Sequence, residues 1–202
     1  MTKTLRRVLW VLALFAFGWL PTIATAGPIT YTETFTASGT VNGSPFDGTV
    51  MFSLTSDTTL VFGNCDGISG VFCTPNTMAT VSIQGFGAGT FTDLFNVFVN
   101  QNIGVAGFTD DSLEDIVDLA NPAFTTYDLK SPIGPLNTTY FFTDNGVMLG
   151  SSLGTVVFDS FSGTPTFQAS EGQGSTPEPG SFVLFGSGLF GLSLVIRRKL
   201  RL

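Results

Sequence analysis

The chain has 202 residues, with 8 Lys and Arg, 15 Asp and Glu and no His, which gives a net charge of −7. The length suits one domain, and residues 27–176 hold 14 acids against the single base Lys130. One base cannot neutralise the phosphates of a nucleic acid. Without His, no His-based triad, imidazole proton shuttle or His metal site can form. These counts argue against nucleic-acid binding and against His chemistry.

The first 26 residues have the pattern of a secretory signal peptide. Three bases come first, namely Lys3, Arg6 and Arg7. An apolar run from Val8 to Leu20 follows, and Ala24-Thr25-Ala26 form an A-x-A cleavage site. The apolar run is shorter than the roughly 20 residues that a membrane span needs. We therefore expect signal peptidase to cut after Ala26 and leave Gly27 as the N-terminus, in preference to an uncleaved anchor.

Residues 27–169 have the composition of one β-rich extracytoplasmic domain. Thr, Val and Phe favour strands, and Gly and Asn mark the turns. A first hairpin is predicted from Ile29–Val41 and Phe46–Leu54, because Asn42-Gly43 supplies the positive φ angles of a type I′ turn. A second is predicted from Thr138–Thr143 and Val147–Leu149 across Asp144-Asn145-Gly146. Further strands are expected around Val81–Ile83, Val97–Val99, Val156–Phe158 and Phe161–Phe167.

One short helix is predicted between residues 111 and 120. Leu113, Ile116, Val117 and Ala120 have the i, i+3, i+4, i+7 spacing of an apolar helix face. Asp111 with Glu114 resembles a capping box, and Asn121-Pro122 would end the helix. Short strands with turn signals and one helix predict a mainly β fold, a β-sandwich or a jelly-roll.

Cys65 and Cys73 are the only cysteines. In an exported protein they are expected to form a disulfide. The alternative, a redox pair, is disfavoured because the spacing is not C-x-x-C.

Catalysis without His would have to use carboxylates, for which Glu33, Glu114 and Asp159 are candidates. No motif pairs them, so we predict no enzyme, no catalytic residue and no cofactor. A Ca²⁺ site is the alternative for the acidic cluster of Asp110, Asp111, Glu114, Asp115 and Asp118. Their spacing is not that of an EF-hand loop, so we predict surface charge in place of a metal site.

The last residues have the parts of a membrane-anchored signal. A Ser- and Gly-rich linker, residues 170–176, leads to Pro177-Glu178-Pro179. The uncharged run Ser181–Ile196 would reach about 24 Å as a helix, close to the bilayer core of about 30 Å. Four bases follow, namely Arg197, Arg198, Lys199 and Arg201, and they should stay cytoplasmic.

These three parts in this order, over residues 177–202, resemble a PEP-CTERM sorting signal. The resemblance implies recognition of Pro177, Glu178 and Pro179 by exosortase in a Gram-negative bacterium, with the basic tail as the stop signal. It also implies a cell-surface or extracellular-matrix destination, in species that make exopolysaccharide. The stretch Phe86 to Lys130 resembles ectodomains that often carry such signals.

The sequence thus predicts an exported, non-enzymatic surface or matrix protein, held in the cytoplasmic membrane by its C-terminal segment before processing. A carbohydrate-binding module that associates with exopolysaccharide is one alternative. An acidic Ca²⁺-responsive adhesin is the other.

Overall fold

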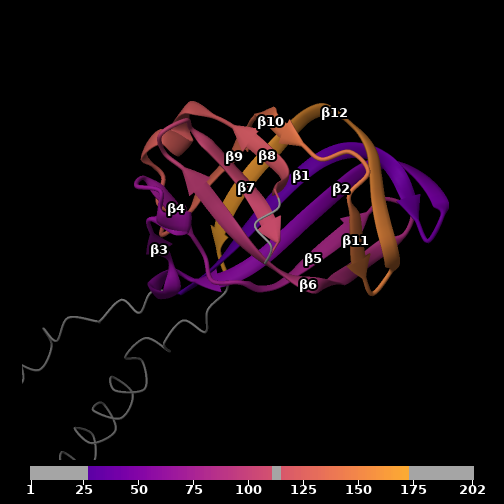
Figure 1. The fold of residues 1–202 in the computed structure, drawn as a ribbon, viewed down its shortest axis with the longest axis horizontal. Helices are drawn as coiled ribbons and strands as arrows, with labels where there is room; N and C mark the ends of the chain where they lie inside the picture. The colour runs from indigo at the N-terminus through magenta and orange to yellow at the C-terminus, as the bar shows by residue number, and fades with distance from the viewer. Residues whose placement is uncertain (1–26, 111–114, 173–202) are drawn as a thin grey trace, which may run out of the picture.

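The computed structural model describes residues 27–110 and 115–172, and 69% of these residues lie in strands (Figure 1). All strand pairs are antiparallel. The predicted mainly β class is therefore confirmed. The signal peptide, the linker beyond Gly172 and the C-terminal segment lie outside the described residues.

The longest pairing is the hairpin of β1 (Pro28–Val41) and β2 (Ser44–Asp57). The residues of β1 alternate between buried and half-exposed from Ile29 to Val41, as expected for a strand with one face on a core. Asn42 and Gly43 have φ angles of 49° and 77°, which suit a two-residue turn of type I′. The first predicted hairpin is confirmed, and it runs in register along both strands.

The strands join into one sheet that closes on itself. The order β10-β8-β7-β6-β11-β12-β1-β2-β5 is completed by a second pairing of β6 with β5. Six strands (β6, β11, β12, β1, β2 and β5) therefore form a closed ring, and β7, β8 and β10 extend from β6. The further strands are β3 (Phe62–Gly63), β4 (Val71–Cys73), β5 (Thr77–Ile83), β6 (Gly87–Asn100), β7 (Val105–Asp110), β8 (Asp115–Ala120), β9 (Ile133–Asn137), β10 (Thr139–Thr143), β11 (Met148–Ser151) and β12 (Gly154–Glu171). Three short 3-10 helices cover Thr58–Leu60, Cys65–Gly67 and Pro122–Thr126.

Phenylalanine rings fill the space between these strands. Phe52 on β2 lies 5.1 Å, between ring centroids, from both Phe35 on β1 and Phe91 on β6. It is also 5.9 Å from Phe108 on β7 and from Phe158 on β12. These edge-on contacts add about 0.5–1.5 kcal/mol each to the gain from burial. The core is thus aromatic although residues 27–172 contain no Trp.

The first and last described residues are neighbours. Ile29 is in register with Glu171, and the Gly172 N–H donates to the Pro28 carbonyl at 2.7 Å. Ser170 and Glu171, the first residues of the predicted linker, therefore belong to β12 and pair with β1. This is a correction of the linker boundary, because the pairing with β1 continues to the end of that strand.

The helix predicted between residues 111 and 120 is wrong over its second half. Asp115–Ala120 form β8, which pairs with β7 on one side and β10 on the other; residues 111–114 lie outside the described residues. Ile116, Val117, Asp118 and Leu119 are all buried. A short apolar run that is buried on both faces has the same periodicity as a buried helix segment, so periodicity misled the prediction. The β-branched pair Ile116 and Val117 favours the strand.

The second predicted hairpin is also wrong. β10 pairs with β8, whereas β11 pairs with β12 and β6. Between them, the Asp144 N–H donates to the Ile116 carbonyl at 3.0 Å, and the Gly146 N–H donates to the Phe158 carbonyl at 2.7 Å. The Asp-Asn-Gly segment therefore passes from one partner strand to another. The hairpin in this region joins β11 to β12, with Ser151 opposite Gly154.

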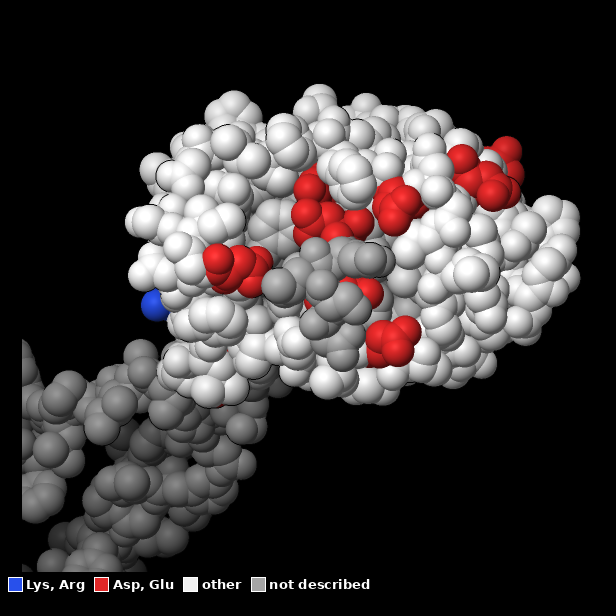
Figure 2. Space-filling model, in the orientation of Figure 1, with Lys and Arg blue, Asp and Glu red and all other residues white. Residues whose placement is uncertain are grey.

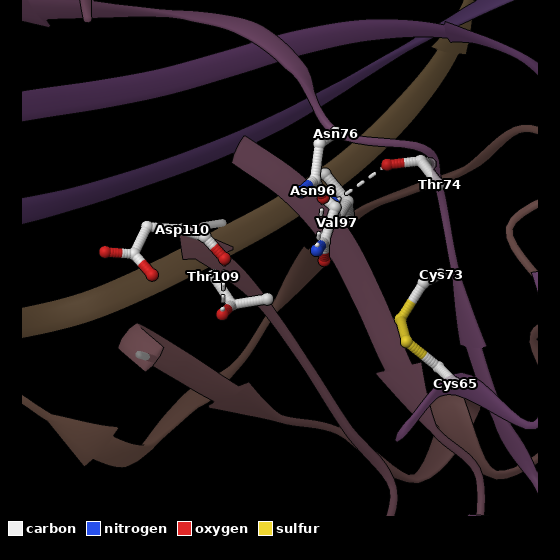
Figure 3. The surroundings of a disulfide bond; sticks show 8 residues. All are labelled: Cys65, Cys73, Thr74, Asn76, Asn96, Val97, Thr109 and Asp110. Carbon is white, nitrogen blue, oxygen red and sulfur yellow. Dashed lines mark hydrogen bonds between the residues drawn. A yellow bond between two sulfur atoms is a disulfide. The ribbon is translucent and has the colours of Figure 1, made fainter. Parts of the chain in front are cut away.

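Cys65 and Cys73 are joined by a disulfide, with a Cα–Cα distance of 5.8 Å (Figure 3). The loop between them is short, so loop closure contributes at most about 2–3 kcal/mol to stability. Next to Cys73, the Thr74 hydroxyl accepts the Val97 N–H at 2.9 Å. The disulfide loop is thereby fixed to the side of β6.

Candidate functional site

Figure 2 shows several acidic groups and one basic group on the visible face of the molecule. Lys130 is the only base among the described residues. The negative charge is therefore carried by carboxyl groups with almost no compensation from cations.

A pocket of about 430 Å³ lies on the part of the sheet that extends beyond the ring. Its lining residues come from β8, β10 and the segment after β10: Asp115, Asp118, Phe141, Phe142 and Asp144. The pocket therefore combines three carboxyl groups with two aromatic rings.

A β-bulge places the two adjacent phenylalanines. Tyr140 pairs with Leu119 and Phe142 pairs with Asp118, so Phe141 is an extra residue on β10. The Tyr140 hydroxyl donates to the Ser162 carbonyl at 2.8 Å and ties β10 to β12. Phe141 and Phe142 are 58% and 46% exposed, large fractions for aromatic side chains in a domain with an aromatic core.

Asp118 is the buried carboxyl of the pocket. It is in register with Gly107 on β7, and a Cβ on Gly107 would come within 2.5 Å of Asp118 Oδ1. Only a glycine at position 107 therefore leaves room for the Asp118 side chain. Asp118 is 4% exposed, and its Oδ1 has no hydrogen-bond partner among the described residues. Burial, and secondly the charge of Asp115, raise the pKa of Asp118 to about 8.

Asp115 lies at the start of β8, on the same pocket. Burial raises its pKa, and so do the negative charges of Asp66 and Asp110. The carboxyl groups of this region thus act on one another as like charges, which makes each later ionisation less favourable than the one before it.

Glu33 is a second buried carboxyl, in the middle of β1. It lies between the buried residues Tyr31 and Phe35 and is in register with Phe52 and Phe167. Neither carboxyl oxygen has a hydrogen-bond partner in the described ranges. Burial, and secondly the charge of Asp118, raise the pKa of Glu33 well above its usual value. Glu33 therefore holds its proton to a higher pH than an ordinary glutamate does.

Of the three carboxylates considered for catalysis, the described residues include Glu33 and Asp159, and these two are not brought together. Glu33 is fully buried and is not part of the pocket lining, so it cannot touch a substrate there. Asp159 is exposed on β12, and Glu114 lies outside the described residues. The arrangement of an acid and a base on opposite sides of a sugar ring is therefore not formed by Glu33 and Asp159.

The acidic cluster considered for Ca²⁺ is only partly described. Asp110 ends β7, and Asp115 and Asp118 lie on β8, whereas Asp111 and Glu114 fall in the gap. Within residues 27–110 and 115–172, no three Asp, Glu, Cys or His side chains are grouped so that they could hold a metal ion.

Sequence reasoning missed Phe141, Phe142 and Asp144, because their meeting with β8 depends on a long-range strand pairing. Two signals for the buried acids were present. Glu33 stands at a position of β1 where the alternation between Tyr31 and Phe35 requires an apolar residue. Asp118 interrupts the run Ile116-Val117-Asp118-Leu119.

The signals at the two ends of the chain lie outside the described residues, so only the sequence bears on them. Residues 175–199 match the PEP-CTERM protein-sorting motif. The chain carries a PEP-CTERM sorting signal. This signal indicates an exported protein with a membrane-anchored C-terminal segment, which exosortase processes to the cell surface.

The match is confined to 175–199 and does not include the pocket. No curated protein and no solved structure is significantly similar to the chain. In the described ranges there is no helix whose length and apolar character would let it cross a membrane.

Proposed function

We propose that this protein is a non-enzymatic component of the cell surface or extracellular matrix of a Gram-negative bacterium. Signal peptidase removes residues 1–26, and residues 27–171 form the domain that remains outside the cytoplasmic membrane. Exosortase then removes the anchor near Pro177-Glu178-Pro179. The PEP-CTERM match at residues 175–199 carries the sorting part of this proposal.

The architecture of the domain supports a durable external role. The six-stranded ring leaves no free edge within it, which reduces the risk of edge-to-edge aggregation. The contacts of Phe52 with Phe91 and Phe108 join β2 to β6 and β7 across an aromatic core. Contacts of this kind across the interior are common to a β-sandwich and a jelly-roll, the two predicted fold types.

Mass spectrometry of the mature protein from its host tests the proposal. We expect an N-terminus at Gly27 and a C-terminus upstream of Ser181, in protein recovered from the cell surface or the medium. In cells whose exosortase has been inactivated, the C-terminal segment should remain on the chain. An intact C-terminus in surface protein from cells with active exosortase would contradict the proposal.

A carbohydrate-binding role is the second candidate, and the pocket favours it. Sugar sites commonly combine aromatic faces with polar groups, and Phe141 and Phe142 lie beside three carboxyl groups. For the Ca²⁺-responsive adhesin, the described residues offer no such observation.

Co-sedimentation with the exopolysaccharide of the host tests this candidate. Replacing Phe141 and Phe142 by alanine should lower the bound fraction at least about fivefold, because the stacking faces are lost. Phe62 on β3, which is 47% exposed and outside the pocket, provides the matched control Phe62→Ala. Equal losses in the two variants, or no binding by the unchanged protein, would reject the sugar site.

A further inference from the structure

The pocket on β8 and β10 carries negative charge that nothing in the described structure neutralises. The charges that act on Asp115 and Asp118 come from Asp66, Asp110 and Asp115, all of them acids. A bound cation would be attracted to each of these acids and would offset the repulsion among them. The pocket is therefore electrostatically suited to a positively charged ligand.

Two further observations identify the kind of cation. Asp118 lines the pocket, is 4% exposed, and has an Oδ1 atom without a hydrogen-bond partner in the described residues. The exposed rings of Phe141 and Phe142 can attract a cation to their faces. Aromatic faces are poor ligands for a hard metal ion, which takes oxygen atoms, and the described acids do not form a three-ligand group. An organic cation can contact both the carboxyl groups and the aromatic rings that line the pocket.

We propose that this pocket binds an organic ammonium group, with Asp115, Asp118 and Asp144 accepting its N–H bonds and Phe141 and Phe142 covering its carbon skeleton. A volume of about 430 Å³ is within the usual range for a small ligand. The same group occurs on amino sugars and on lysine side chains, so either could supply it.

Binding should release a proton from the site. Asp118 has a pKa of about 8, so it is mostly protonated at neutral pH in the free protein. A bound ammonium group favours the carboxylate. The O–H bond of Asp118 then breaks, its proton goes to the buffer, and the ammonium group keeps its own protons.

Titration calorimetry on the full chain in detergent, at about pH 7, tests the proposal with four probes. Glucosamine and Nα-acetyl-lysine amide carry an ammonium group, whereas glucose and Nα-acetyl-norleucine amide are their neutral counterparts. At least one ammonium probe should bind about tenfold or more tightly than its neutral counterpart, and the preferred probe distinguishes the two sources. Buffers with different heats of ionisation should give different apparent binding heats, since a proton is released.

Two variants with equal charge change separate the pocket from the general acidity of the protein. Asp115→Asn with Asp144→Asn should weaken binding of the ammonium probe about tenfold or more. Asp47→Asn with Asp159→Asn, at exposed positions outside the pocket, should change it less than about twofold. Equal effects of the two pairs, equal binding of charged and neutral probes, or no binding of either ammonium probe would overturn the proposal.

Discussion

We expect this protein to lose stability as the pH rises. Replacing Glu33 by glutamine should make the slope of stability against pH less steep. The pKa of Glu33 is raised in the folded protein, so the folded state holds a proton that the unfolded state releases at about pH 4. Stability is then fully present below that pH and falls with increasing pH. The fall is up to about 1.4 kcal/mol per pH unit for each such group. Glutamine has the same shape and no charge, so it removes the contribution of Glu33.

The remaining slope should come from Asp118. Because its folded pKa is about 8, its contribution is lost between about pH 4 and about pH 8 and does not change above that. Thermal unfolding of the full chain in detergent, from about pH 5 to about pH 9, measures both effects. The difference in midpoint between Glu33→Gln and the unchanged protein should shift in favour of glutamine as the pH rises.

Glu171 provides the matched control, since it is exposed at the end of β12. Glu171→Gln should leave the pH dependence unchanged. The explanation fails if Glu33→Gln and Glu171→Gln show the same slope, whatever their absolute midpoints. The comparison of slopes matters because an unpartnered amide inside the core can itself lower stability at every pH.

In cells whose exosortase has been inactivated, deleting Pro177–Leu202 should move the protein from the membrane fraction to the soluble exported fraction. The deletion removes the uncharged run Ser181–Ile196 and the four bases that follow it. Together these supply the apolar length and the positive-inside signal of a membrane anchor. Fractionation of the host and immunoblotting of each fraction measure the change.

A finer variant separates recognition from anchoring. Replacing Pro177, Glu178 and Pro179 by alanine leaves the apolar run and the basic tail in place. This variant should stay in the membrane and keep its C-terminal segment, because exosortase no longer recognises it. The sorting assignment would be wrong if, in cells without exosortase activity, the deletion variant and the full-length protein were distributed identically.

Local signals in the sequence predicted the parts of the fold that depend on local chemistry. Asn42-Gly43 supplies positive φ angles, and the alternation of β1 then sets its pairing with β2. Where the strand pairing of a segment depends on residues far away in the sequence, the prediction from local signals was wrong. Asp144-Asn145-Gly146 has the composition of a hairpin turn, yet its backbone bonds go to Ile116 and Phe158.

The pocket could not be predicted from the sequence for the same reason. Phe142 meets Asp118 only because β10 pairs with β8, and the spacing of the apolar residues in β8 predicts a helix there. Five acids near residues 110–118 indicated charge, but not that Asp118 is buried over Gly107. The sorting motif was accessible because its order of residues identifies it without a fold.

The pairing of Pro28 with Gly172 means that the chain enters and leaves the domain at one pole. The opposite pole lies at the other end of β1, whose 14 residues at about 3.3 Å each span about 46 Å. The β1–β2 and β11–β12 turns meet at this far end. Asn42 links these turns by donating to the Leu153 carbonyl and accepting the Thr155 N–H. The end of the domain opposite its two chain ends therefore carries a pair of turns that the side chain of Asn42 joins.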